Sequence, residues 1–90
     1  MKLIVRRTSQ FKRDVKRIVR SGKDIDRLFD VIEKLIEKRE LSFEYHDHPL
    51  SGNYKNKRDC HIESDWILIY AIENDELILY RTGNHSQLFS

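Results

Sequence analysis

Two different spacings of apolar residues divide this 90-residue chain, and they restrict the folds open to it. Through residues 11–36, apolar side chains recur every three or four positions, which is the period of an amphipathic helix. From residue 57 onward they alternate or run without interruption, as they do in β-strands. Because the strand patterns are grouped after the helical ones, the chain is predicted to fold as an α+β domain.

Capping and turn residues set the boundaries of the elements. A first strand at 3–5 precedes a helix that begins at Thr8 or Ser9 and ends at Gly22, and a second helix begins at Asp24. A loop follows from residue 40 to residue 56, where the helical period is lost. Three further strands are predicted at 57–63, 66–72 and 77–81, and a tail at 84–89 is long enough for one helical turn.

The predicted order of elements is therefore β-α-α-β-β-β. Residues 1–90 are expected to form a single domain, because a second core would need roughly 50 residues or more of its own. The connection between the two helices is short, so they are expected to lie nearly antiparallel. The predicted architecture is an antiparallel sheet with both N-terminal helices packed on one face.

The formal net charge of +2 hides an uneven distribution along the chain. Residues 1–23 carry a net charge of +8, residues 24–48 carry −4, and residues 49–90 carry −2. The first helix has basic residues four positions apart, and these like charges repel one another. The basic face is either an ordinary solvated surface or a contact for a polyanion such as RNA or for an acidic protein segment. Its residues are Lys12, Arg13, Lys16, Arg17 and Arg20.

Several classes of protein are not expected from this sequence. No apolar run approaches the roughly 18 residues of a membrane span, and the first residues do not resemble a signal peptide, so a cytoplasmic domain without membrane contact is predicted. The single Cys60 excludes an intramolecular disulfide and paired-cysteine zinc sites, and its place inside a predicted strand indicates a packing role. Nucleoside triphosphate chemistry is not expected either, because the chain has no glycine-rich phosphate loop.

All four histidines follow residue 45, in or beside loops and strand ends, where several elements can meet in one cleft. Each alone is explained as an ordinary loop histidine, but two or three together supply an acid and a base near pH 7. Asp65, at the start of the central strand, could orient an imidazole or simply form a turn. No compact metal-ligand motif is present, so neither a metal nor another cofactor is predicted. The histidines are His46, His48, His61 and His85.

Cleavage of RNA without a metal needs three kinds of group. A base takes the 2′-hydroxyl proton, an acid protonates the leaving 5′-oxygen, and cations stabilise the charge that develops around phosphorus. Histidines supply the first two. Arg81 is either a bidentate phosphate anchor or, as a strand residue, the partner of a carboxylate. The candidate cations are Lys55, Lys57, Arg58 and Arg81.

Three sequence blocks stand out in the C-terminal half: HPLSGNY at 48–54, RDCHIESDWILIY at 58–70 and RTGNHSQLF at 81–89. Together, in this order and spacing, they resemble the YafQ-type toxins of the RelE/ParE toxin–antitoxin superfamily. The resemblance implies a RelE-like fold and a toxin that is a ribosome-dependent endoribonuclease. Such an enzyme cuts mRNA by attack of the 2′-hydroxyl and leaves a cyclic phosphate and a 5′-hydroxyl.

Carried over position by position, the resemblance implies that His85 is the proton donor. It also implies that His48, His61 and Asp65 are required for cleavage. With His85 as the acid, the general base is expected to be either His48 or His61. His46 matches no residue with a known role in the family.

Three more positions match the family pattern. Trp66 and Phe89 match aromatic residues of the active-site region, and Asp59 matches an acid beside His61 whose role is secondary. From the residues themselves, Phe89 is expected to stack on an RNA base, to shape the pocket of His85, or to be a hydrophobic tail that closes the core.

The resemblance also implies partners. These are the 70S ribosome with its mRNA, and a cognate antitoxin, usually a DNA-binding dimer whose extended tail wraps the toxin. Operator DNA is then bound only through the antitoxin complex. Two rival functions stay open: a gyrase-inhibiting toxin of the ParE branch, which is not a nuclease, and an inactive module that binds RNA or an antitoxin. The sequence pattern predicts neither the codon preference nor the identity of the antitoxin.

Overall fold

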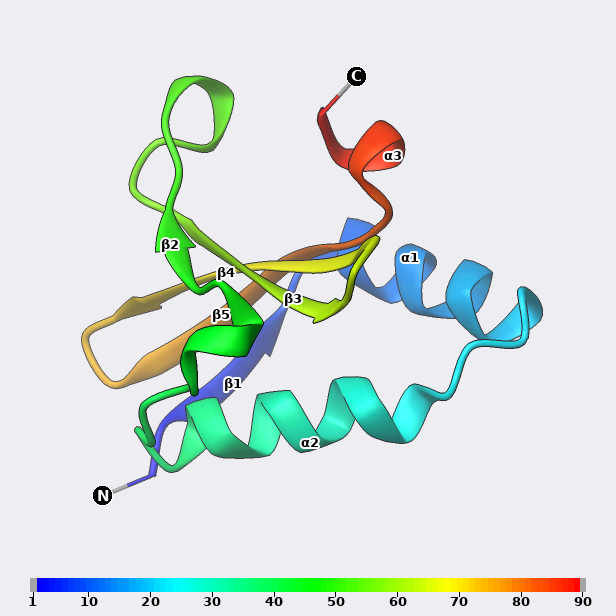
Figure 1. Ribbon diagram of the computed structural model, residues 1–90. Coiled ribbons are helices and arrows are strands. Elements are labelled where there is room, and N and C mark those ends of the chain that lie inside the picture. Colours follow the sequence, from blue (N-terminus) through cyan, green and yellow to red (C-terminus); the bar gives the residue numbers. More distant parts are fainter. Residues whose placement is uncertain (1, 90) are drawn as a thin grey trace.

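The computed structural model describes residues 2–89 as three α-helices and a five-stranded mixed sheet with the strand order β1-β5-β4-β3-β2 (Figure 1). No helix within these residues is long and apolar enough to cross a membrane. The elements are β1 (Ile4–Arg7), α1 (Ser9–Arg20), α2 (Ile25–Ile36), η1 (Phe43–Tyr45), β2 (His48–Pro49), η2 (Gly52–Tyr54), β3 (Arg58–Glu63), β4 (Trp66–Glu73), β5 (Glu76–Gly83) and α3 (His85–Phe89).

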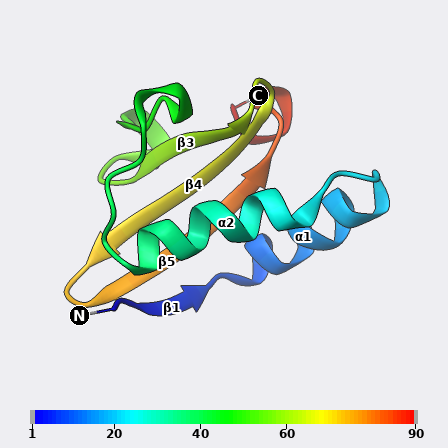
Figure 2. The same ribbon diagram turned by 60° about the horizontal axis from the view of Figure 1, so that its bottom comes forward.

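Both long helices begin where their capping residues predict. The Thr8 hydroxyl accepts a 3.0 Å hydrogen bond from the Phe11 N–H at the start of α1. At the start of α2, the Asp24 carboxylate accepts a 3.1 Å bond from the Asp26 N–H. The two helices run in roughly opposite directions on one side of the sheet, as predicted (Figure 2).

The sheet is antiparallel from β2 to β5, but its other edge differs from the prediction. β1 pairs with β5 in parallel, with Ile4 opposite Glu76 and Arg7 opposite Leu79. The prediction of a wholly antiparallel sheet is therefore wrong at β1, and the sheet is mixed. A short apolar strand looks the same in sequence beside a parallel or an antiparallel neighbour, so its direction could not be predicted.

A second difference lies in residues 40–56, which were predicted to form a loop. This segment contains the 3₁₀ turns η1 and η2 and the two-residue strand β2. β2 pairs antiparallel with β3, so that His48 lies opposite Asp59. A strand of two residues is too short to show an alternating pattern, yet it places His48 on the sheet edge.

Both faces of the central strand β4 are covered, as its continuous apolar run predicts. On the helical side, Trp66 and Tyr70 are buried in the core formed with α1 and α2. On the other side, Ile67 packs with Leu88 of α3. Near the end of β4 the strand is no longer covered, and Ile72 is 48% exposed. The α3 turn is thus anchored on the face of the sheet opposite the long helices.

Candidate active site

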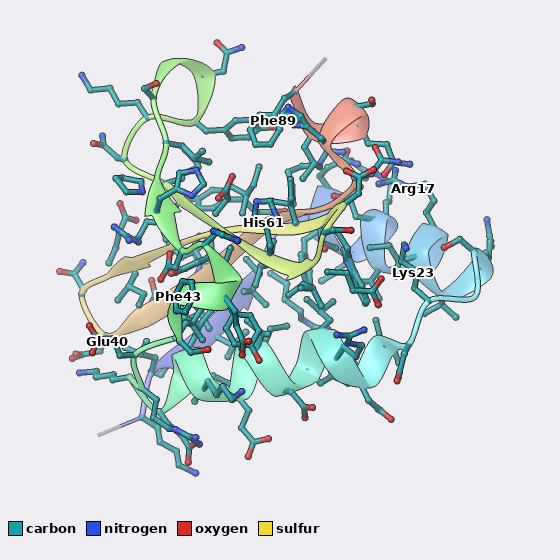
Figure 3. The ribbon with its side chains drawn as sticks, viewed as in Figure 1. Arg17, Lys23, Glu40, Phe43, His61 and Phe89 are labelled. Atoms are coloured by element: carbon teal, nitrogen blue, oxygen red, sulfur yellow. The ribbon has the colours of Figure 1, made fainter. Side chains whose placement is uncertain are left out.

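Side chains from β2, β3, the β3–β4 turn and α3 line one hollow of about 340 Å³. Figure 3 shows His61 on β3 and Phe89 on α3, two of the residues that line it. The hollow contains all four residues that the family resemblance marks as required for cleavage. Its lining residues are His48, Leu50, Asp59, His61, Ser64, Asp65, Ile67, His85 and Phe89.

The ring of His48 is held through one nitrogen. Its Nδ1 lies 2.6 Å from the carbonyl oxygen of His46 and 3.1 Å from Oδ1 of Asp59. Because a carbonyl oxygen can only accept, Nδ1 carries the proton, and in the neutral ring Nε2 keeps a lone pair. The His48 side chain is 51% exposed, so Nε2 can accept a proton from a bound substrate.

Asp59 lies beside the histidines and is almost fully buried. Burial raises the pKa of its carboxyl, and the charges of His48, His61 and His85 counteract part of that rise. Among the described residues, Oδ1 of Asp59 has no aligned hydrogen bond, because the nearby Nδ1–H of His48 is engaged by a carbonyl. Oδ1 of Asp59 is therefore a buried acceptor that can still take a hydrogen bond, and it lies next to the histidines of the site.

His85 is the first residue of α3 and is held at its backbone and at its ring. Its N–H donates a 3.0 Å hydrogen bond to Oδ1 of Asp65. Its ring centroid lies 4.9 Å from that of Phe89. Asp65 thus positions the backbone of His85, and Phe89 shapes the pocket in which the His85 ring lies, which was one of the alternatives for that residue.

Tyr54 contributes to the site but was not singled out from the sequence. Its ring meets Phe89 edge to face with centroids 5.5 Å apart, and its hydroxyl donates a 2.9 Å hydrogen bond to the carbonyl of Leu88. It thereby ties η2 to the α3 turn that carries His85. Tyr54 ends the first family block, which was the one available signal, but no local pattern shows that it reaches a tail 34 residues away.

Trp66 lies in the core beside the site and does not line the hollow. It is fully buried, and its Nε1–H donates a 2.9 Å hydrogen bond to the Thr82 hydroxyl. That hydroxyl in turn donates to the carbonyl of Ile67 at 2.9 Å. These bonds hold the end of β5, three residues before His85.

Comparison with known proteins decides the family. The family model described as the bacterial toxin of the type II toxin–antitoxin system, YafQ, matches residues 3–90. The chain belongs to the YafQ family. It is 41% identical to the mRNA interferase toxin YafQ of Escherichia coli strain K12 over 83 residues, which cover 91% of this chain and 90% of that protein.

Solved structures of relatives share the fold of this YafQ-family toxin. It matches the crystal structure of the E. coli DinJ–YafQ toxin–antitoxin complex with a TM-score of 0.91 and 37% identity, covering 100% of both chains. It matches the metal-bound toxin from Helicobacter pylori with a TM-score of 0.90 and 37% identity, covering 97% of this chain and 99% of that one. The predicted α+β, RelE-like fold is confirmed.

Three of the predicted cations do not line the hollow. Arg58 Nε forms an ion pair with Asp47 Oδ1 at 3.1 Å, and this partner raises the pKa of Arg58 although partial burial would lower it. Lys57 Nζ lies 4.6 Å from the centroid of the Tyr80 ring. Lys55 is exposed after η2. Within residues 2–89, no lysine or arginine lines the 340 Å³ hollow.

Arg81 is paired with a buried carboxylate, the second alternative considered for it. Its guanidinium donates to Asp14 at 2.8 and 3.1 Å. Burial would raise the pKa of Asp14, but hydrogen bonds, the strongest from Arg81, hold that pKa below its ordinary value. Arg17 also lies 3.1 Å from Asp14 and 3.4 Å from the Thr82 carbonyl, and its side chain stays 41% exposed.

The rest of the basic face of α1 is exposed but lies outside the hollow. The structure therefore separates the basic surface from the histidine site. The remaining exposed cations of α1 are Lys12, Arg13, Lys16 and Arg20.

Metal-ligating groups are sparse in the described chain. Residues 2–89 contain no group of three or more histidine, cysteine, aspartate or glutamate side chains placed to hold a metal ion. Cys60 is fully buried, and burial raises the pKa of its thiol above the ordinary range. The packing role predicted for Cys60 fits this environment.

Proposed function

We propose that this toxin is an mRNA interferase, a ribosome-dependent endoribonuclease that uses its own side chains as acid and base and needs no metal ion. The observation that carries the proposal is the meeting of His48, His61 and His85, from β2, β3 and α3, at one hollow. The E. coli relative, named mRNA interferase toxin YafQ, supports it. Histidines exchange protons near neutral pH, as cleavage at a phosphodiester requires.

His48 is the general base in this proposal. Its Nδ1–H is held by the His46 carbonyl, so Nε2 is the nitrogen that takes the proton from the 2′-hydroxyl. The carboxylate of Asp59, 3.1 Å from Nδ1, stabilises the positive charge that His48 then carries. These contacts favour His48 over His61 as the base.

His85 is the general acid. The 2′-oxygen, having lost its proton to His48, forms a bond to phosphorus while the bond from phosphorus to the 5′-oxygen breaks. The protonated His85 ring gives its proton to that 5′-oxygen. One product ends in a 2′,3′-cyclic phosphate, and the other begins with a 5′-hydroxyl. The Asp65 and Phe89 contacts keep His85 in place for this step.

The charge that develops on the phosphate oxygens needs a positive group close by. Because no lysine or arginine of the described chain lines the hollow, we assign this role to the protonated ring of His61. The exposed basic face of α1 contributes to binding and not to chemistry, through contact with ribosomal RNA.

The toxin is further proposed to be neutralised by a cognate antitoxin. The E. coli relative was crystallised as the DinJ–YafQ toxin–antitoxin complex, and this chain matches that toxin over its full length. The antitoxin is expected to be a DNA-binding dimer whose tail wraps the toxin. Contact with operator DNA then occurs through the antitoxin, and the toxin acts in the cytoplasm.

Induced expression of the toxin without its antitoxin tests the function. Immediate arrest of protein synthesis with cut transcripts supports the nuclease. Intact transcripts with gyrase-linked DNA breaks and SOS induction would instead support a ParE-like toxin. If folded protein accumulates and none of these effects appears, the domain is a binding module and the proposal fails.

A further inference from the structure

His46 is an exposed side chain on a firmly held backbone. It follows η1 with φ +49°, a conformation that few residues other than glycine adopt. Its N–H donates a 2.9 Å hydrogen bond to the Phe43 carbonyl, and its own carbonyl accepts the 2.6 Å bond from His48. Both backbone groups are therefore engaged, and the exposed imidazole projects from a fixed point.

The His46 ring also contacts the catalytic cluster. Its centroid lies 5.5 Å from that of His61, with 69° between the ring planes, an edge-to-face pair. In such a pair one ring cannot cover both faces of the other, so at least one face of His46 is free of His61. His46 does not line the 340 Å³ hollow, which places it outside the proton-transfer groups.

The open side of His46 borders a second, larger hollow of about 840 Å³. Its wall includes His48 and His61, so the two hollows meet at the proposed base and at its neighbour. Arg27 and Glu63, 2.9 Å apart, and the Ser64 hydroxyl add polar groups to its lining. The larger hollow combines an aromatic wall with hydrogen-bonding side chains, the combination that binds a splayed-out RNA base.

We propose that the larger hollow binds the base of a nucleotide next to the scissile phosphate, and that His46 stacks on this base. The inference rests on the proposed function. If His48 and His85 act on one phosphodiester, the RNA on one side of it lies beside Phe89, and the RNA on the other side passes into the larger hollow. His46 is then a binding residue that sets which sequences are cut.

The test uses the intact toxin on a translated transcript that offers many codons, with cleavage sites mapped by primer extension. His46→Ala removes the stacking ring, and His46→Phe restores an aromatic ring without imidazole nitrogens. Phe43→Ala is the matched control, because this side chain is 89% exposed on the same turn but does not line the hollow. The KM for the programmed ribosome and the kcat are measured for each protein.

We expect His46→Ala to raise KM about tenfold, the size of one lost base stack, with kcat within about threefold of the parent. The distribution of cleavage sites should broaden. His46→Phe should restore the KM, and Phe43→Ala should change nothing. An unchanged KM and unchanged sites in His46→Ala would overturn the inference, and so would a fall in kcat alone, which would make His46 a support for His61.

Failure of the proposed function gives a different result. If the wild-type toxin cuts no translated transcript, the nuclease proposal fails and the base-binding proposal fails with it. If the wild type cuts and the His46 variants match it in KM and in cleavage sites, only the base-binding proposal fails.

Discussion

Asp14 on α1 holds Arg81 on β5 through two hydrogen bonds of 2.8 and 3.1 Å, across 67 positions of sequence. The same carboxylate accepts the Thr82 N–H at 3.1 Å. The Thr82 hydroxyl accepts a hydrogen bond from the indole N–H of Trp66, and His85 follows Thr82 by three residues. The basic helix is thus joined to the strand that leads into the proposed catalytic turn.

Replacing Asp14 by alanine should destabilise the fold by about 3 kcal/mol, because it leaves the guanidinium of Arg81 without its buried partner. Urea unfolding measures this loss. Asp30→Ala, which removes an exposed carboxylate of α2, is the control and should change stability by less than about 0.5 kcal/mol. Equal stability of the two variants would contradict the role given to Asp14.

The Asp14 contribution should also depend on pH with a defined sign. Its pKa is lowered in the folded state, so the unfolded chain takes up the proton first as the pH falls. The stabilisation is complete above the ordinary aspartate pKa of about 4, and it is lost as the pH falls through the lowered folded value. Urea midpoints of wild type and Asp14→Ala should therefore converge in acid.

Asp59→Asn should stabilise the protein at pH 7 and slow cleavage. Burial raises the pKa of Asp59, so its ionised form at neutral pH costs folding free energy, and this cost disappears as the pH falls through the folded value. The amide removes the buried negative charge, and with it the charge that stabilises His48 once that ring has taken up a proton. Thermal unfolding and single-turnover cleavage check the two effects, and a variant that is less stable yet fully active would contradict both.

Tyr54→Phe should lower kcat several-fold with little change in KM. The substitution removes only the hydroxyl that holds the Leu88 carbonyl, so the α3 turn with His85 becomes less fixed. Tyr80→Phe is the control, a loss of one tyrosine hydroxyl that does not line the 340 Å³ hollow. A drop in stability without any change in kcat would reduce Tyr54 to a packing residue.

The cleavage rate should be bell-shaped between about pH 5 and 8, because His48 must be neutral while His85 and His61 are protonated. In His48→Ala the residual rate should lose its rise on the acidic side, where the wild-type base gives up its proton. Single-turnover rates across this range measure both. A rise on the acidic side that persists in His48→Ala, and disappears in His61→Ala, would make His61 the base.

Local signals explain what the sequence analysis predicted well. The caps at Thr8 and Asp24 and the apolar run of β4 act over a few residues, so the helices and the central strand could be placed. The meeting of the histidines in one cleft was predicted from their positions beside loops and strand ends, and their roles were predicted from the family blocks. Two features could not be predicted because they depend on residues distant in sequence. These are the parallel pairing of β1 with β5 and the two-residue strand β2.

The same limit applies within the site. The sequence shows that Arg81 and Arg17 carry positive charge. Only the fold shows that both form ion pairs with the buried Asp14. Tyr54 likewise acquires its role through Leu88 and Phe89, which follow it by more than 30 residues. A residue's chemistry can be read from its type, whereas its availability depends on the tertiary contacts it makes.

Primer extension on a translated mRNA, with toxin that was first treated with EDTA and then separated from the chelator, tests the central claim most directly. The H. pylori relative is metal-bound, so the chelator separates the proposed mechanism from a metal-dependent one. Wild type and Ser86→Ala, an exposed neighbour on α3, should cut, leaving 5′-hydroxyl and 2′,3′-cyclic phosphate ends, while folded His85→Ala should be slower by about 10²–10⁴-fold. Undiminished cleavage by His85→Ala, or loss of wild-type cleavage after the EDTA treatment of the toxin, would contradict the account.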